Sequence, residues 1–471
     1  MHPSPKLIRV LRRLLLALVG TATLLALVVT VENWRGDRAW AVAENEMRAR
    51  GEPIHFAEFA LPPVPDAQNL FAAPLLAEAI FAPPDNPSQK DRRALSPFRG
   101  FQSFAAPDAS PPDFTALRTQ LRQNGFLKAP FTTVPALDLL HSLDSIKPLL
   151  DELRSAARTR PLARIARNPR PYSEASQLDA DTAFQLANAL AVRARAEIAL
   201  GRIADAHADI FALQRYATGL TLNPTTLLHL LIGLEIHASA QRAIADGIRL
   251  QAWSDAQLAE FQNQLAALQS LAALRESLLH ERAAAFHVLD SGPPAPPMPE
   301  WPRWLFHGWA QQNKVSIYRR EQSEIFSAFT VEPARITPPP TKPPAPRTGL
   351  FAPWFSPYEV ISRLVISNLA NITVGLGAAV DRLSLDSVAC ALERHRLAHG
   401  HHPDSLAALV PRYLPAIPTG LFDGEPVRYL ALPDGAHQLR TSGKNGRDDQ
   451  GSDDDVVLKI PAAAPPDKGI N

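Results

Sequence analysis

The residues in this sequence best suited to chemistry are five aspartates in a glycine-containing stretch near its end. They are Asp448, Asp449, Asp453, Asp454 and Asp455, which lie within eight residues. Ca²⁺ takes about 6–8 oxygen ligands at about 2.3–2.6 Å in a flexible shell, so dense carboxylates on tight glycine turns suit it. The stretch is therefore a candidate cation-binding loop.

The loop is not an EF-hand. With Gly446 at the sixth position, Thr441 and Ser452 occupy the first and twelfth positions, where an EF-hand has carboxylates. Two interpretations stay open. One is a loop folded around a cation, and the other is an exposed turn whose charge repulsion is relieved by Lys444, Arg447 and water.

Histidines offer a second candidate metal site. His395 and His399 stand four residues apart on an expected helix, and His401 and His402 follow directly. Such spacing suits zinc, but no glutamate follows the first histidine as it does in a zinc protease. We interpret these histidines as packing positions.

Six arginines crowd the segment around "RTRPLARIARNPRP". They are Arg154, Arg158, Arg160, Arg164, Arg167 and Arg170. Arginine suits an anionic polymer or lipid headgroups, and the alternative is solvated helix faces paired with nearby acids such as Asp151 and Glu152. The sequence has neither a phosphate-cradling P-loop nor a serine-nucleophile elbow, so it offers no convergent catalytic group.

The composition narrows the class of protein. A formal net charge of +1 predicts no general attraction to nucleic acid. Cys390 is the single cysteine, which rules out a disulfide within the chain, and we expect it to be a small core residue. The 45 prolines are clustered, which predicts extended connectors between helical parts.

The amino terminus carries a membrane signal. Four basic residues precede a run of 18 uncharged residues, 14–31, which as a helix is about 27 Å long, close to the bilayer's hydrocarbon thickness. Basic charge in front predicts an N-terminus in the cytoplasm, a single pass through the inner (cytoplasmic) membrane, and the bulk of the chain outside the cytoplasm. The alternative is a cleaved signal peptide, but no small-x-small cleavage site follows the run.

The chain divides into six parts by these signals. They are the basic stub and membrane anchor (1–35), a short helix with a proline-rich wrapping segment (36–135), a helical-hairpin domain (136–332), a proline-rich linker (333–357), a long helix with a small α+β domain (358–461) and a tail (462–471). The predicted fold class is mainly α, with an N-terminal membrane helix and a small C-terminal α+β domain.

Apolar periodicity predicts the helical middle. Stripes around Leu186 and Leu190, and around Ile210 and Leu213, predict two antiparallel helices joined by a turn at Gly201. Another helix is predicted to begin at Ser254, an N-cap residue with Gln257 three positions on. The proline-rich segment containing "PDAQNLFAAP" is predicted to dock on the protein.

Two further features of the sequence allow structural predictions, an aromatic cluster and the long helix after the linker. We predict that the aromatic cluster Trp301, Trp304, Phe306 and Trp309 is a packing lid. The long helix after the linker contains Arg363, Asn368 and Asn371, which argue against a second membrane span. Gly375 and Gly377 predict a break in its middle.

The C-terminal segment resembles the globular domain of the major pseudopilins of type II secretion systems. The matching order is "ALERHRLAHGHHPDSLAALV", "RYLPAIP", "FDGEPVRY" and the glycine–aspartate loop, about 80 residues in all. The resemblance implies a pseudopilin-like helix and short antiparallel sheet, and a loop that binds Ca²⁺ through Ser442, Asn445, Asp453 and Asp455. The whole chain also resembles membrane-anchored envelope proteins with no known activity.

These features together predict a non-enzymatic, membrane-anchored extracytoplasmic scaffold or interaction protein. Its expected partners are the membrane, through residues 14–31, and other envelope proteins, with no nucleic acid and no small-molecule substrate. One alternative is an extracytoplasmic hydrolase acting on cell-envelope material, with carboxylates that the sequence does not align in a cleft. Another is an accessory of a secretion or pilus-like assembly.

Overall fold

The protein, represented by a computed structural model, is mainly helical, as predicted. The structure describes residues 5–81, 94–98, 112–123, 127, 130–165, 179–222, 226–266, 268, 271–291, 303–337, 358–433, 436–452 and 454–460. The α-helices are α1 (Pro5–Ala49), α2 (Pro74–Phe81), α4 (Phe114–Gln123), α5 (Pro135–Ser142), α6 (Lys147–Thr159), α7 (Ala180–Ala199), α8 (Ile203–Leu222), α9 (Leu227–Arg249), α10 (Asp255–Ala266), α11 (Ala272–Ser291), α12 (Arg303–Glu321) and α13 (Val360–His399).

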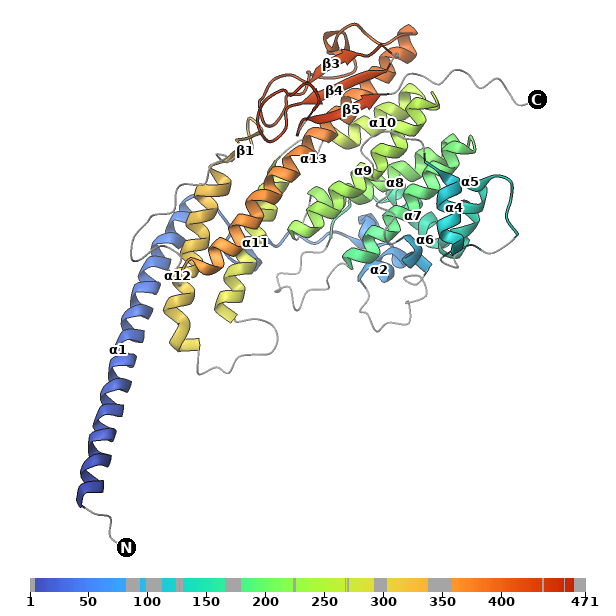
Figure 1. The fold of residues 1–471 in the computed structure, drawn as a ribbon. Helices are drawn as coiled ribbons and strands as arrows, with labels where there is room; N and C mark the ends of the chain where they lie inside the picture. The colour runs from blue at the N-terminus through green and yellow to red at the C-terminus, as the bar shows by residue number, and fades with distance from the viewer. Residues whose placement is uncertain are drawn as a thin grey trace.

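Small antiparallel sheets complete the fold. β1 (Phe329–Thr330) pairs with β2 (Arg335–Ile336), and β3 (Arg428–Ala431), β4 (His437–Thr441) and β5 (Val456–Ile460) form a sheet in the order β3-β4-β5. This second sheet lies at one end of the molecule, and the free end of α1 projects from the other (Figure 1).

The first helix, α1, is unbroken from the apolar run into the body of the protein. None of its most apolar window is buried, and the helix is long and apolar enough to cross a membrane. The prediction of a separate short helix from Gly36 is wrong, because α1 continues through it. A Cβ at Gly36 would lie 2.6 Å from the Gly308 carbonyl oxygen of α12, so the two backbones meet directly. Ala43 and Met47, in the second half of α1, are buried.

The long helix α13 also passes a membrane-span test of length and composition, but 44% of its most apolar window is buried. It packs along α10 and α12. The predicted break at Gly375 and Gly377 is wrong, because α13 is continuous. Gly377 serves packing instead, since a Cβ there would lie 2.3 Å from Cδ1 of Ile336 in β2.

The predicted helical hairpin is formed by α7 and α8. Gly201 makes the turn between them at φ +72°, a conformation that favours glycine. The predicted apolar residues Leu186, Leu190, Ile210 and Leu213 are all buried. The hairpin packs on α9, and its side chains share one core with the second half of α13 and with the β3-β4-β5 sheet.

The start of α10 follows the capping pattern that the sequence indicates. The Gln257 backbone N–H donates to Ser254 Oγ at 3.3 Å, and the Ser254 backbone N–H donates to Gln257 Oε1 at 3.0 Å. The proline-rich segment docks as predicted. The Asn69 amide donates to the Arg164 carbonyl oxygen and accepts from its backbone N–H, and Leu70 and Phe71 are buried beside it.

The described arginines of the arginine-rich segment bind groups of the protein itself. Arg154 and Arg158 pair with acids, and Arg160 and Arg164 donate to backbone carbonyl oxygens. Arg154 binds Asp209 at 2.6 Å and Glu197 at 3.1 Å, both on the α7–α8 hairpin. Arg193 binds the same Asp209 carboxylate. The sequence analysis names Asp151 and Glu152 as nearby partners for these arginines. The partners of Arg154 are instead acids of α7 and α8, because the fold places these helices beside α6. Arg167 and Arg170 lie outside the described residues.

A buried ion cluster joins α1 to the body. Arg282 of α11 binds Glu52, just after α1, at 2.7 Å and Glu321 at the end of α12 at 2.9 Å. All three side chains are buried. Arg275 also pairs with Glu52, at 3.4 Å. Burial raises the pKa of Glu321 to about 7.

The aromatic cluster is not a packing lid. Trp304 is 56% exposed and Phe306 is 49% exposed, in the first turn of α12. Trp309 is half-buried, and Trp301 lies outside the described residues.

The raised pKa of Glu321 makes stability depend on pH. Between the unfolded-state pKa, near 4.5, and the folded-state value near 7, the folded protein keeps a proton that the unfolded chain has lost. The contribution of this group to the free energy of unfolding is therefore present at low pH and lost as pH rises through 7, by about 3 kcal/mol at most. We expect Glu321→Gln to flatten this loss in urea unfolding of the detergent-solubilised protein between pH 5 and pH 8.

The matched control is Glu324→Gln, which changes an exposed glutamate in the turn that directly follows α12. It should leave the pH slope as it is in the wild type. An equal slope in wild type and Glu321→Gln contradicts the assignment.

Candidate metal centre

The aspartate loop joins β4 to β5. The two strands pair Thr441 with Val456, so the loop of residues 442–455 leaves and re-enters the sheet at neighbouring positions. Positive φ angles at Gly446, Gln450 and Gly451 fold it back on itself. Gly443 passes so close to the returning chain that a Cβ would lie 1.8 Å from the Asp454 carbonyl oxygen. This crossing requires glycine.

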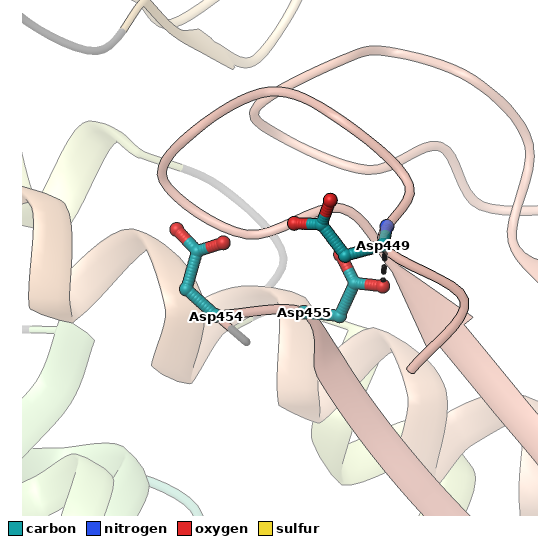
Figure 2. Close-up of side chains that lie close together, drawn as sticks. All are labelled: Asp449, Asp454 and Asp455. Carbon is teal, nitrogen blue, oxygen red and sulfur yellow. Dashed lines mark hydrogen bonds between the residues drawn. The ribbon is translucent and has the colours of Figure 1, made fainter. Parts of the chain in front are cut away.

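Three of the five aspartates converge. One carboxylate oxygen from each of Asp449, Asp454 and Asp455 lies within 4.8 Å of the other two. Figure 2 shows the three side chains gathered on one side of the loop, with Asp449 directly above Asp455. Each is half-buried.

Backbone and amide donors hold these carboxylates. Asp455 Oδ2 accepts the backbone N–H groups of Asp449 at 3.0 Å and Gly451 at 2.9 Å. Asp454 Oδ2 accepts the backbone N–H of Asn445 at 2.9 Å, and the Asn445 amide donates to Asp449. The second oxygens of Asp454 and Asp455 are shielded from solvent and accept no hydrogen bond from any residue that the structure describes.

The arginines near the loop neutralise a different aspartate. Arg440 binds Asp448 at 2.8 Å and Arg428 binds it at 3.0 Å. The Arg440 hydrogen bond holds the pKa of Asp448 below its usual range. The ion pairs found in the described loop thus leave the repulsion within the aspartate trio uncompensated.

The residues fit a hard cation on these grounds. Buried carboxylate oxygens without a donor are costly unless a positive charge completes them. Three carboxylates supply between three and six ligand atoms, and carbonyl oxygens and water can fill a Ca²⁺ shell. Such a centre can tie the two ends of the loop together.

The structure does not bring the four residues named from the resemblance together at one site. Asp455 belongs to the trio, and Asn445 lies beside it with its own Oδ1 accepting the Arg447 backbone N–H at 2.7 Å. Ser442 is buried and its hydroxyl donates to Asp423 at 2.6 Å. Asp453 lies outside the described residues.

Asp449 and Asp454 complete the trio and were not singled out by the resemblance. Both stand in the aspartate-rich stretch, but no spacing rule distinguishes them from Asp448. Their convergence depends on where the glycine turns fall.

The histidine candidate is engaged in local contacts. His395 Nδ1 lies 3.1 Å from the His401 carbonyl oxygen, and His399 Nδ1 lies 3.0 Å from the His395 carbonyl oxygen. The rings of His395 and His399 stack at 4.1 Å. Within the described ranges, the aspartate trio is the one group of three His, Cys, Asp or Glu side chains close enough to share an ion.

A polar cleft that the sequence does not indicate lies beside the buried ion cluster. Its volume is about 360 Å³, and its lining consists of Arg50, Glu52, Arg275, Gln322, Phe326, Phe329 and Val331. Gln322–Phe326 is a π-helical turn. Glu52 is the acid in this lining, and it already binds Arg282, while Glu321 is 1% exposed and does not line the cleft. The cleft thus does not present the facing carboxylates that the hydrolase alternative requires.

Comparisons with protein-family models, with curated proteins and with solved structures found no match to this chain. The interpretation of the aspartate trio as a candidate metal centre therefore depends on its geometry.

The trio predicts a specific response to calcium. In full-length protein in detergent, Ca²⁺ at about 100 times its dissociation constant should raise the free energy of unfolding by about 2.7 kcal/mol over protein in excess chelator. Asp455→Asn and Asp454→Asn each remove a ligand charge and should weaken Ca²⁺ affinity about tenfold or more, measured by calorimetric titration.

Two control variants sharpen this test. Asp448→Asn makes the same change at an aspartate bound by arginines, and Ser442→Ala removes a hydroxyl that faces Asp423. Both should keep Ca²⁺ affinity within about twofold of wild type. A wild type indifferent to calcium would leave the loop as an exposed turn.

Proposed function

We propose that this chain is a membrane-anchored extracytoplasmic scaffold protein whose distal loop is tied by Ca²⁺. The observation that carries the proposal is the continuity of α1. The helix that contains the apolar run also packs along α12 inside the body, with no linker between them. A body joined rigidly to its anchor suits a protein that positions partners at a fixed place above a membrane.

The orientation follows from charge. Lys6, Arg9, Arg12 and Arg13 precede the apolar run and favour a cytoplasmic N-terminus, which places the body outside the cytoplasm. The unbroken helix through residue 49 favours an anchor that is retained over a cleaved signal peptide. The partners are the lipid around residues 14–31 and proteins of the cell envelope.

The order of a long helix, a small antiparallel sheet and an aspartate loop supports the pseudopilin-like interpretation of the C-terminal part. It also keeps a role beside a secretion or pilus-like assembly as the second candidate. Co-purification of the full chain with pseudopilus components would distinguish that role from a general scaffold.

The topology is testable with single cysteines in a Cys390→Ala background. Leu430→Cys, at an exposed position of β3, should react with a membrane-impermeant maleimide added to intact spheroplasts. Lys6→Cys should react only after the membrane is permeabilised. Labelling of both sites, or of Lys6→Cys alone, in intact spheroplasts contradicts the proposed orientation.

A further inference from the structure

α12 runs beside α1 in parallel and in constant register. Asn33 donates to the Trp304 carbonyl oxygen at 2.9 Å, His307 contacts Asp37 at 2.7 Å, and Arg50 pairs with Gln322. The sequence separations of these pairs are 271, 270 and 272. By this offset α12 begins, at Arg303, level with Glu32. That position is one residue beyond the apolar run of residues 14–31.

The helices cannot slide past each other at this level. A Cβ at Gly308 would lie 2.3 Å from the Glu32 carbonyl oxygen. The Asn33 side chain also accepts the Gly308 backbone N–H at 2.7 Å. The Asn33 side chain therefore hydrogen-bonds both to the carbonyl oxygen of residue 304 and to the N–H of residue 308. These two groups are one helical turn apart on α12. The height of α12 above the apolar run is therefore fixed.

The first turn of α12 exposes apolar side chains at this height. Trp304 is 56% exposed, Leu305 39% and Phe306 49%, and Trp34 on α1 is 61% exposed. Among the tryptophan and phenylalanine side chains that the structure describes, Trp34, Trp304 and Phe306 are the exposed ones. All three lie where α1 leaves its apolar run.

Charged groups lie at the level of this turn and beyond it, and none lies in residues 14–31. Glu32, level with the start of α12, pairs with Arg35 at 3.3 Å. Arg38 lies over the Trp34 ring at 5.8 Å, and His307 faces Asp37 on the side away from the apolar run. Tryptophan with an apolar ring and a polar N–H favours the headgroup level of a bilayer, with charges just outside it. The order along the two helices matches that of a membrane interface.

We propose that Trp304, Leu305, Phe306 and Trp34 form a membrane-contact foot that inserts into the outer interface of the bilayer spanned by α1. The occupant of this surface is lipid, because the surface is continuous with the apolar run of α1, which the proposed span places in lipid. The foot gives the body a second point of attachment and restrains its tilt about α1. This inference rests on the proposed membrane span.

The test measures depth with nitroxide labels on full-length protein in phosphatidylcholine vesicles. Single cysteines in the Cys390→Ala background replace Val19 in the apolar run, Phe306 in the foot, and Val42, an exposed residue of α1 about 16 Å beyond the run. For each label, the collision rate with oxygen, which concentrates in lipid, is compared with the collision rate with a water-soluble nickel chelate.

The expected order is lipid at Val19→Cys, a shallow lipid position at Phe306→Cys, and water at Val42→Cys. A label at residue 306 as accessible to nickel as the label at residue 42 overturns the inference. So does a label at residue 306 protected from both reagents, since a second copy or a partner protein then covers the surface. If the label at residue 19 also reports water, the membrane span itself fails, and the two failures are distinguishable.

A paired variant tests the restraint independently. Trp304→Ser with Phe306→Ser should broaden the distances between a donor dye at Leu364→Cys, again in the Cys390→Ala background, and acceptor dyes in the headgroups. Leu228→Ser with Leu231→Ser changes two exposed leucines of α9 and should leave those distances unchanged. Equal distance distributions in wild type and the Trp304/Phe306 variant contradict the restraint.

Discussion

The contact between Gly36 and Gly308 is the constraint on which the arrangement of this protein depends. One helix, α1, has an apolar run with no buried residue and a second half that packs into the body. Only residues without side chains let two helix backbones meet this closely, and Asn33 then fixes their register through one turn of α12. The body therefore begins where the apolar run ends, and no flexible connector separates them.

Arginine–carboxylate clusters lie at the junctions between the helices of this protein. Arg282 joins the segment after α1 to α11 and α12, and Arg154 and Arg193 join α6 to the α7–α8 hairpin through Asp209. Burying such ions has a high desolvation cost, so they add little net stability over apolar packing. Losing one partner is nonetheless strongly destabilising, because it leaves a buried charge unpaired. We infer that these clusters select one arrangement of the helices.

The sequence predicts those features that depend on local patterns. Helix geometry alone predicts the apolar stripes of α7 and α8, the Gly201 turn and the Ser254 cap. These features depend on residues close together in the sequence. The continuity of α1 through Gly36 and of α13 through Gly377 was not predictable, because each glycine is explained by a distant backbone or side chain. The exposure of Trp304 and Phe306 was missed for a related reason. An apolar pattern in a sequence does not distinguish a surface that packs on protein from one that contacts lipid.

At the aspartate loop, composition indicates a cation site, but the turns at Gly446 and Gly451 decide that Asp449, Asp454 and Asp455 converge while Ser442 faces Asp423.

The long helix α13 connects the two ends of the molecule. Near its start, Ser362 contacts Ser316 of α12 at 2.8 Å, and α12 is fixed to α1. Its second half shares a core with the β3-β4-β5 sheet that carries the aspartate loop. A helix of 40 residues is about 60 Å long, and α13 has no break along that length. The β3-β4-β5 sheet lies at the far end of the molecule from the free end of α1, so an ion bound at the loop would act far from the apolar run (Figure 1). The unbroken helix α13 contacts α12 near its start and the β3-β4-β5 sheet in its second half. The position of the sheet relative to the apolar run therefore depends on how α1 packs on α12. A rigid connection of this kind is the property on which the proposed scaffold function depends.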